Sequence, residues 1–322
     1  MQEFVEQFVS LCKKKPRRIV FPEALDVRIL ETARFLVDHR LAFPLLLGVP
    51  SAIRDFAARN KISTQGIRIS HPLHDPEFNS YVKKLSMDKE INRTDAEELL
   101  RDPLNIAHWM VKAGTADLCI AGNVEKTDHV LRSAIRYTGV KPGVKTVSGA
   151  YLMVAPDNQK ILLFADCIVT PRPTSEQSAE IAVQSAETYT ALTGDISRVA
   201  MLSFSTAGSA AHEMADKVRE AVAMVKKNRP SLLLEGEIQI DAAIVPEIAA
   251  QKAPNGRLQG QANVFVFPSL NAADSGWKIL KELAGYTAIG SFLQGLNGRV
   301  IKLCDTCTTD DIINIALVAS GL

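Results

Sequence analysis

Short runs of β-branched and other apolar residues alternate along the chain with longer stretches whose apolar residues recur at helical spacing. The apolar runs predict strands at residues 18–21, 43–48, 117–122, 146–154, 160–164, 199–204 and 264–267. The amphipathic stretches predict helices at residues 24–38, 127–137, 175–193, 212–228, 241–252, 274–284 and 308–319. Strands that alternate with helices are typical of a mostly parallel sheet covered on both faces, so we predict an α/β protein.

The alternation breaks at Lys141-Pro142-Gly143, where two extended runs follow each other closely. These runs, 146–154 and 160–164, predict an antiparallel pair or a strand that crosses between domains. We therefore expect two α/β domains with an interdomain cleft. The first domain comprises residues 1–142 plus 293–322, and the second comprises residues 143–292.

The composition and charge of the chain argue against several classes of binding partner. The 322 residues are 47% hydrophobic, and 37 Lys and Arg stand against 36 Asp and Glu, a formal charge of +1. Nucleic acids and anionic membranes are bound by clustered basic surface, so this balance argues against both as main partners. Five cysteines are few and odd in number, which favours reduced thiols and a cytoplasmic protein. The six histidines are scattered and indicate no metal site.

The strongest candidate for ligand binding follows the strand at 199–204. Ser205, Thr206, Gly208 and Ser209 form a small polar loop before the next helix. Backbone amides and hydroxyls in such a loop can bind a phosphate or carboxylate, and the helix N-terminus adds favourable potential. The structural alternative, a capped helix start, has about the same weight from the residues alone. No Gly-x-Gly-x-x-Gly follows a strand and no P-loop lysine is present, which excludes the two common nucleotide motifs.

Three further candidates have a structural alternative each. Arg132 is either a phosphate clamp near a strand end or a solvated surface arginine. Asp311, at the start of the last helix, either complements the helix dipole or acts as a general base. Cys304 and Cys307 form one Cys-x-x-Cys, which lacks the second pair of a zinc site and the setting of a thioredoxin-like pair. We therefore expect two thiols packed near a loop.

Twelve segments, in one order over nearly the whole chain, resemble those of the phosphate acyltransferases of the phosphate acetyltransferase (phosphotransacetylase) type, including the short form associated with ethanolamine utilisation. They are Arg18–Ala24, Ala121–Asn123 with Val130–Arg132, Phe164–Cys167, Pro173–Thr174 with Glu180–Ala182, Met201–Ala210, Glu235–Ala243, Pro246–Glu247 with Lys252–Pro254, Ala262–Val264 and Leu293–Leu296. The resemblance implies two domains like those of isocitrate and isopropylmalate dehydrogenases, a homodimer and a role in acetate metabolism. It also implies the reaction acetyl-CoA + phosphate ⇌ acetyl phosphate + CoA, with coenzyme A as a substrate and no permanently bound cofactor.

The resemblance also implies roles for residues. By position, Asp311 matches the aspartate thought to take the proton from the coenzyme A thiol, and Arg132 matches one phosphate arginine. A second family arginine corresponds to Arg93 or Arg101. The family's Asp-Leu-Ser-Arg-Gly-Cys reads Lys302-Leu303-Cys304-Asp305-Thr306-Cys307 here, so Cys304 stands at the family serine.

The same stretch exchanges two charges. Asp305 replaces the family arginine and Lys302 replaces the family aspartate, so Lys302 is expected to supply part of the missing positive charge. Removing one such donor from an active site typically lowers the rate about a hundred- to a thousandfold. The alternative function is therefore a catalytically impaired paralogue that binds acyl-CoA or phosphate as a sensor or partner subunit. A dehydrogenase of the related fold is a distant third, because no metal-binding carboxylate set or nicotinamide motif stands out.

Overall fold

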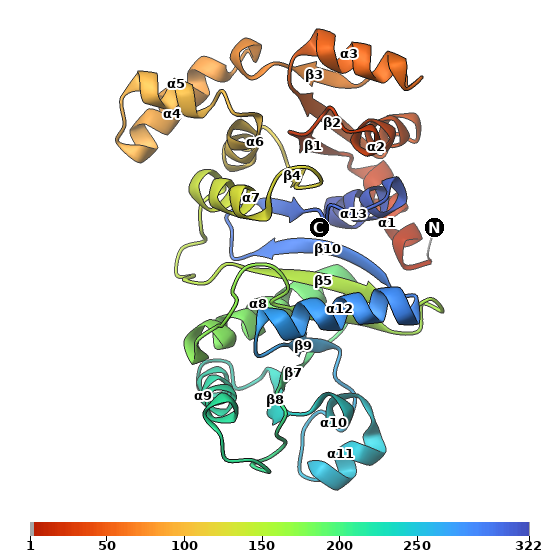
Figure 1. Cartoon of the computed structure of the whole chain (residues 1–322), viewed down its shortest axis with the longest axis vertical. Coiled ribbons are helices and arrows are strands. Elements are labelled where there is room, and N and C mark those ends of the chain that lie inside the picture. The colour runs from red at the N-terminus through yellow and green to blue at the C-terminus, as the bar shows by residue number, and fades with distance from the viewer. Residues whose placement is uncertain (1–2, 322) are drawn as a thin grey trace. The chain divides into compact units, whose positions relative to one another are not determined.

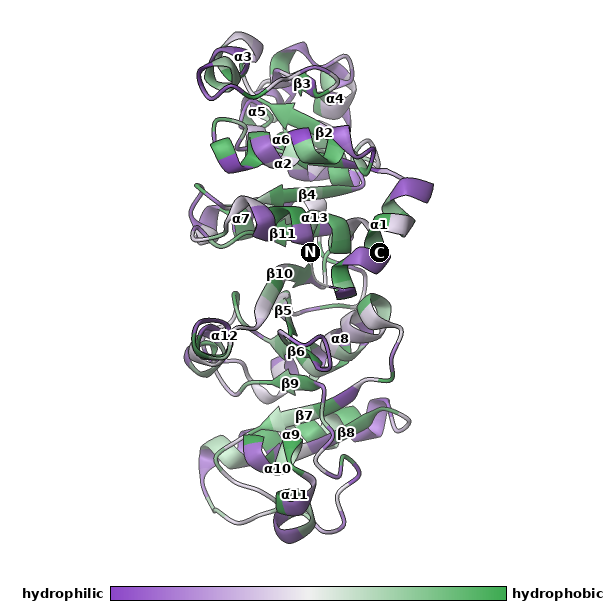
Figure 2. Ribbon diagram, turned by 90° about the vertical axis from the view of Figure 1, so that its right-hand side faces the viewer, coloured by the Kyte–Doolittle hydropathy of each residue, from purple (hydrophilic) through white to green (hydrophobic). Residues whose placement is uncertain are grey.

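The structure is a computed structural model and describes residues 3–321. The chain separates into two compact units, described here as unit 1 (residues 1–141 and 296–322) and unit 2 (residues 142–295). Each unit contains a sheet with helices around it (Figure 1). Most of the strands are coloured as hydrophobic in Figure 2, as the apolar runs of the sequence predict.

Unit 1 has a parallel sheet in the order β3-β2-β1-β4-β11. Its strands are β1 (Arg17–Phe21), β2 (Ala42–Leu47), β3 (Arg68–Ser70), β4 (Leu118–Ala121) and β11 (Arg299–Lys302). Its α-helices are α1 (Glu3–Lys14), α2 (Val27–Asp38), α3 (Pro50–Arg59), α4 (Phe78–Lys89), α5 (Arg93–Leu99), α6 (Pro103–Lys112), α7 (Thr127–Ser133) and α13 (Thr309–Gly321). Helix α13 packs against α1 and α2, and its residues 312, 313 and 315–320 are buried in the core.

Unit 2 has a mixed sheet in the order β10-β5-β6-β9-β7-β8. Its strands are β5 (Ser148–Val154), β6 (Ile161–Ala165), β7 (Arg198–Leu202), β8 (Leu233–Ile238), β9 (Val264–Val266) and β10 (Thr287–Gln294). Its helices are α8 (Ser175–Thr193), α9 (Glu213–Asn228), α10 (Ile240–Ile244), α11 (Pro246–Lys252) and α12 (Leu270–Ala284). Helices α8 and α12 cover opposite faces of this sheet (Figure 2). The pairing of β5 with β6 is antiparallel, which confirms the predicted pair; β10 also pairs antiparallel, with β5.

The α/β class and the mostly parallel pairing are confirmed, while four predicted helices differ by three residues or more or change type. The helix predicted at 274–284 begins at Leu270, because Ser269 caps it. The helix predicted at 241–252 is two helices, because Pro246 cannot continue α10 and instead starts α11. The helix predicted from 24 begins at Val27, because Asp26 caps it in an extended conformation. The helix predicted at 127–137 changes to a π-helical turn at Ala134. None of the helices in residues 3–321 combines the length and apolar character of a membrane span.

Candidate active site

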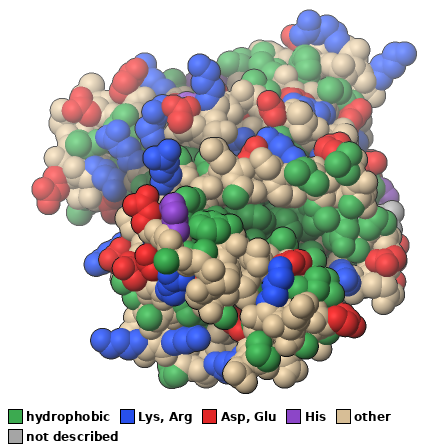
Figure 3. All heavy atoms as spheres, turned by 60° about the horizontal axis from the view of Figure 1, so that its bottom comes forward, with side chains coloured by type: hydrophobic (Ala, Val, Ile, Leu, Met, Phe, Trp, Pro, Cys, Tyr) green, Lys and Arg blue, Asp and Glu red, His purple; other side chains and the backbone are tan. Residues whose placement is uncertain are grey.

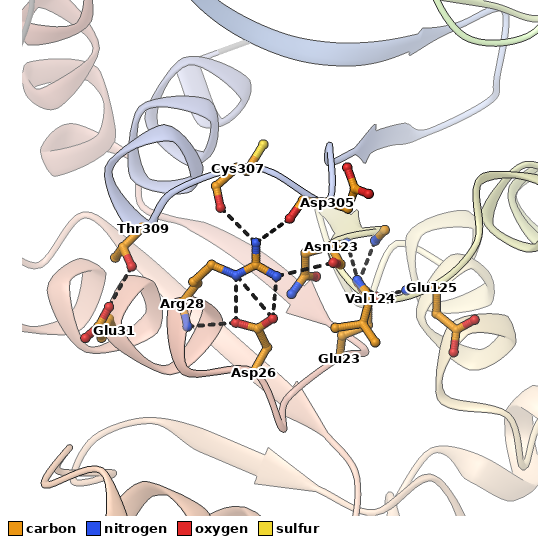
Figure 4. A network of polar contacts seen from close by, with 11 residues as sticks. Glu23, Asp26, Arg28, Glu31, Asn123, Val124, Glu125, Asp305, Cys307 and Thr309 are labelled. Carbon is orange, nitrogen blue, oxygen red and sulfur yellow. Dashed lines mark hydrogen bonds and ion pairs between the residues drawn. The ribbon is translucent and has the colours of Figure 1, made fainter.

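Three loops at the C-terminal edge of the unit 1 sheet are joined by one network of hydrogen bonds (Figure 4). They follow β1, β4 and β11 and comprise residues 22–26, 122–126 and 303–308. Ligands of open parallel sheets bind outside the carboxyl ends of the strands. This edge is therefore the candidate active site of unit 1.

The carboxylate of Glu23 organises the loop after β4. Its Oε2 accepts hydrogen bonds from the backbone amides of Gly122 (2.5 Å) and Asn123 (3.3 Å). Its Oε1 accepts from the amides of Val124 (2.8 Å) and Glu125 (2.5 Å). Both oxygens are thus used, and four consecutive amides point at one side chain, the arrangement of a backbone anion nest.

Arg28 contacts all three loops. Its guanidinium pairs with both carboxylate oxygens of Asp26. It also donates to the carbonyls of Asp305 (2.7 Å), Cys307 (2.8 Å) and Asn123 (3.2 Å). The hydrogen bond with Asp26 is the main cause of the raised pKa of Arg28. Burial works to raise the pKa of Asp26, but the hydrogen bonds from Arg28 outweigh it and the pKa is lowered. Both groups are therefore charged at neutral pH.

Sequence reasoning gave no role to Glu23, Asp26 or Arg28. Glu23 appears only inside a segment that resembles the family, and the helix was predicted to begin at about residue 24. An Asp two residues before an Arg at a helix start is a signal that could have been used, because an N-cap aspartate commonly faces the first turn. The contacts of Arg28 with loops far along the chain have no local signal.

Three residues singled out in the sequence lie at the end of β11 and in the loop after it. Lys302 is buried, and its stem lies over Gly122, where an added Cβ would be 3.1 Å from Lys302 Cε. The thiol of Cys304 contacts Asp305 Oδ1 at 3.4 Å and Thr306 Oγ1 at 3.1 Å. The hydrogen bond from Cys304 is the main reason that the pKa of Asp305 is lowered, and the charge of Lys302 contributes. Asp305 is thus an ionised, exposed carboxylate at the strand end.

Asp311, the third residue of α13, is one half of a reciprocal cap at the start of this helix. Its Oδ2 accepts from the backbone amide of Thr308 at 3.0 Å, and its own amide donates to Thr308 Oγ1 at 3.1 Å. This capping box satisfies two amides of the first turn. The carboxylate is half-buried and held at a fixed position. Its part as a general base stays a prediction.

The predicted phosphate arginines contact acidic or amide neighbours within unit 1. Arg132 on α7 is 73% exposed and pairs with Asp128 at 3.0 Å. Arg93, the first residue of α5, donates to Asn79 Oδ1 at 2.8 Å, whereas Arg101, just beyond the end of α5, pairs with two glutamates of that helix. None of the three belongs to the network of Figure 4. Their binding of phosphate stays a prediction.

In unit 2, the loop after β7 is organised around an internal anion. Ser205 Oγ (2.9 Å) and the Gly208 amide (2.8 Å) both donate to Glu237 Oε1. Arg219 Nη1 reaches the same oxygen at 3.0 Å. Burial works to raise the pKa of Glu237, but these bonds outweigh it and the pKa is lowered. An external anion would have to displace Glu237 to occupy the same donors.

The remaining hydroxyls of this loop also have partners. Thr206 Oγ1 accepts a hydrogen bond from the backbone amide of Gln239 at 2.9 Å, and Ser209 Oγ accepts one from the backbone amide of Thr206 at 3.1 Å. Ser205 and Thr206 are buried, whereas Gly208 and Ser209 are exposed. The sequence could not reveal Glu237 because its partners Ser205, Gly208 and Arg219 lie 32, 29 and 18 residues earlier in the chain. Within residues 3–321, no group of three or more His, Cys, Asp or Glu is placed to hold a metal ion.

Comparison with known proteins gives matches over the whole length. The family described as "Phosphate acetyl/butaryl transferase" matches residues 3–320. The phosphate acetyltransferase of Clostridium acetobutylicum is 36% identical over 98% of this chain and 97% of its own length. That of Bacillus subtilis is 38% identical over 95% of both chains.

Two solved structures agree with this result. A phosphotransacetylase from Streptococcus pyogenes has a TM-score of 0.91 at 35% identity and covers all of this chain and 98% of its own. The EutD phosphotransacetylase from Staphylococcus aureus has a TM-score of 0.89 at 34% identity over 98% of both chains. Identity at this level over full length goes beyond a shared fold.

Proposed function

The chain belongs to the phosphate acetyl/butaryl transferase family, and on that premise we propose that it transfers an acetyl or other short acyl group reversibly between coenzyme A and inorganic phosphate. The reaction is acetyl-CoA + phosphate ⇌ acetyl phosphate + CoA. The observation that carries this proposal is the family match over residues 3–320. Coenzyme A is then a substrate, and the place of the enzyme is in acetate metabolism.

The chemistry needs a base for the thiol. Free thiols have a pKa of about 8.5, so a positioned carboxylate speeds formation of the thiolate at neutral pH. Asp311 is the proposed base. In the direction of acetyl-CoA synthesis, Asp311 takes the thiol proton, the thiolate sulfur attacks the acetyl carbonyl and phosphate leaves. In the opposite direction phosphate attacks the thioester, and the departing thiolate recovers the proton.

Positive charge must balance the phosphate and the developing oxyanion. We assign this role to Arg132 and Lys302, with Arg93 as a further substrate-binding residue. Lys302 is supported by its place directly before the loop that carries Cys304. Cys304 is proposed to line the site beside the reacting sulfur, since its thiol is half-exposed at the strand end.

The loop after β7 is the proposed substrate-binding element of unit 2. Ser205 and Thr206 are buried and hold the loop in shape through Glu237 and Gln239. Gly208 and Ser209 are exposed, so contact with substrate is assigned to them. A bound anion would thus meet the tip of the loop rather than its base.

A thiol-release assay tests the function. Acetyl-CoA is incubated with and without phosphate, and free CoA is followed with a thiol reagent. We expect phosphate-dependent release that falls about a hundredfold or more in Asp311→Asn. Asparagine keeps an oxygen for the Thr308 amide, so the cap survives while the base is lost. The matched control, Asp310→Asn, changes the exposed neighbour and should act like the wild type; equal rates in all three proteins would refute the role of Asp311.

A second candidate function rests on Asp305. An ionised carboxylate where the resemblance to the family implies an arginine would repel phosphate, which favours an impaired paralogue that binds acyl-CoA without turnover. Calorimetric titration with CoA, run beside the thiol assay, separates the two functions. If the wild type binds CoA but does not produce free CoA from acetyl-CoA in the thiol assay, Asp305→Arg should raise the phosphate-dependent rate. A wild type that already turns over at the rate of Asp305→Arg excludes this candidate.

The enzyme is proposed to act as a homodimer through unit 2. A cavity of about 930 Å³ in this unit has a mainly apolar lining that includes Ile240, Ile244 and Ile279, each more than 40% exposed. Figure 3 shows hydrophobic side chains around a hollow on the face turned to the reader. A second copy of the chain would cover such a surface. Sedimentation should give a dimer that Ile279→Glu dissociates and Met87→Glu, on α4, leaves intact; a wild-type monomer would refute the dimer.

The cytoplasm is the proposed compartment. All five cysteines are free thiols, as expected where glutathione keeps proteins reduced.

A further inference from the structure

Cys304 and Cys307 lie at the two ends of one tight turn. The amide of Cys307 donates to the carbonyl of Cys304 at 3.1 Å, with Asp305 and Thr306 between them. A hydrogen-bonded turn of this kind holds its first and last Cα atoms within about 7 Å. A disulfide needs a Cα separation of about 4.4–6.8 Å, so the backbone of this turn is compatible with a bond between the two sulfurs.

We propose that Cys304 and Cys307 form a reversible disulfide in reaction with a low-molecular-weight disulfide of the glutathione type. The pair is then a thiol modification site at the C-terminal edge of unit 1. Neither a zinc site nor a thioredoxin-like unit is required for this chemistry, because a turn and an accessible thiol are sufficient to begin exchange.

The other three cysteines are poor candidates for this reaction. Cys12, Cys119 and Cys167 are at most 2% exposed. Burial raises the pKa of Cys12 to about 11 and raises those of Cys119 and Cys167 well above the ordinary value. Because the thiolate is the reactive form, these thiols are inert toward exchange. Cys304 is half-exposed and is therefore the sulfur that an external disulfide reaches first.

Cys307 is placed to resolve the first adduct. It is buried and directly precedes Thr308, whose side chain caps α13. The guanidinium of Arg28 donates to the carbonyl of Cys307 at 2.8 Å, so a positive charge lies beside this residue. Arg28 also holds the carbonyl of Asp305, so the turn is fixed before any oxidation and little further ordering is needed.

The exchange balances in two steps. The thiolate of Cys304 attacks oxidised glutathione, a Cys304–glutathione disulfide forms and one glutathione thiolate leaves. The thiolate of Cys307 then attacks Cys304 Sγ, the protein disulfide forms and the second glutathione thiolate leaves. The protein loses two electrons and two protons, and oxidised glutathione becomes two molecules of glutathione.

The disulfide would act on the candidate active site. It removes the thiol hydrogen that Cys304 shares with Asp305 and Thr306, in the loop that leads to Asp311. Displacing catalytic groups by about 1 Å can lower a rate about a hundredfold. This consequence, unlike the disulfide itself, rests on the proposed function. Oxidation should lower the rate of acetyl transfer about a hundredfold, and a reductant should restore the rate.

Intact-mass measurement of the full chain after incubation with oxidised glutathione tests the site without any need for activity. We expect the wild type to lose two hydrogens and to yield one cross-linked peptide containing Cys304 and Cys307. Cys307→Ala should instead keep one glutathione on Cys304. Cys304→Ser should take up none, and circular dichroism checks that each variant is folded.

Two results would overturn the site: an unmodified wild type, or a wild type that retains glutathione on Cys304 without closing the disulfide. If Cys307→Ala is unfolded, Cys307→Ser replaces it as the resolving-thiol variant. A disulfide that forms in a protein without acetyl transfer would leave the site standing and refute the proposed function. The two proposals therefore fail separately.

Discussion

Two loops, one in each unit, are folded around a glutamate of the same chain, and they differ in how that charge is balanced. In unit 1, Glu23 is half-buried and is bound by four backbone amides that use both of its oxygens. In unit 2, Glu237 is buried, and Ser205, Gly208 and Arg219 all meet at its Oε1. A cation thus accompanies the buried carboxylate, whereas amide dipoles bind the carboxylate at the solvent edge.

The two glutamates therefore have different roles: Glu237 stabilises the fold of its loop, whereas Glu23 lies next to the groups of the proposed reaction. A buried carboxylate with Arg219 and two further donors stabilises the fold of its loop, and removing it leaves donors without a partner. The nest around Glu23 lies beside Arg28 and the loop after β11, where small displacements affect the proposed reaction. We therefore expect truncation of Glu237 to lower stability most, and changes at Glu23 to lower activity as well.

Truncation of Glu237 should have the largest effect on stability. Glu237→Ala leaves Ser205 Oγ and the Gly208 amide without their acceptor, and it should lower the free energy of unfolding by about 3 kcal/mol. Urea denaturation measures this loss. A variant within about 0.5 kcal/mol of the wild type, the range of ordinary surface changes, would show that the carboxylate does not hold the loop.

A buried histidine in unit 1 should make the stability of the protein sensitive to acid. His108 is fully buried in α6, and its Nδ1 contacts Ser133 Oγ at 2.8 Å. Burial, aided by the charge of His129, lowers the pKa of His108 to about 3. The unfolded state binds a proton near pH 6.5 and the folded state does not, so stability is present above that pH and is lost as the pH falls. The loss should be about 2 kcal/mol at pH 5.

Glutamine at the same position isolates this contribution. His108→Gln removes the titrating ring while leaving a polar side chain, so its unfolding free energy should fall less between pH 7 and pH 5 than that of the wild type. Parallel urea curves at the two pH values give the comparison. Identical pH dependence in both proteins would contradict the assignment to His108.

Substitution of each glutamate by glutamine compares Glu23 and Glu237 directly, with a smaller expected effect on stability. In Glu237→Gln the amide oxygen can still accept all three hydrogen bonds at the Oε1 position. In Glu23→Gln the new NH₂ group must face two backbone amides, because both carboxylate oxygens act as acceptors. Glu23→Gln should therefore lose about 1 kcal/mol more than Glu237→Gln in thermal or urea unfolding. The reverse order would break the comparison.

Where local pattern determined structure, the sequence was sufficient. Helix α8 runs from Ser175 to Thr193 as predicted, since its capping box at Thr174 and Gln177 and the glycine at 194 mark both ends. Strand β10 was missed because Gly290 and Ser291 interrupt its apolar run, and its pairing partner β5 lies far away in the chain. Strand β8 was missed because Glu235, Gly236 and Glu237 are not typical strand residues.

The residues of the candidate site also fall into two groups, those that the local sequence reveals and those that it does not. Cys304 and Asp311 could be found because they lie in one short segment next to the start of a helix. The roles of Glu23 and Arg28 could not, because their partners are about one hundred and almost three hundred residues away in the chain. Contacts of that separation become visible only when the strands are assembled into a sheet.

Formation of the thioester in the reverse direction tests the central claim most directly. Acetyl phosphate and CoA are mixed with the wild type and with Asp311→Asn, and acetyl-CoA is quantified. The account predicts rapid thioester formation by the wild type and a rate lower by about a hundredfold or more in the variant. A folded wild type that binds CoA and forms no acetyl-CoA from acetyl phosphate would contradict it.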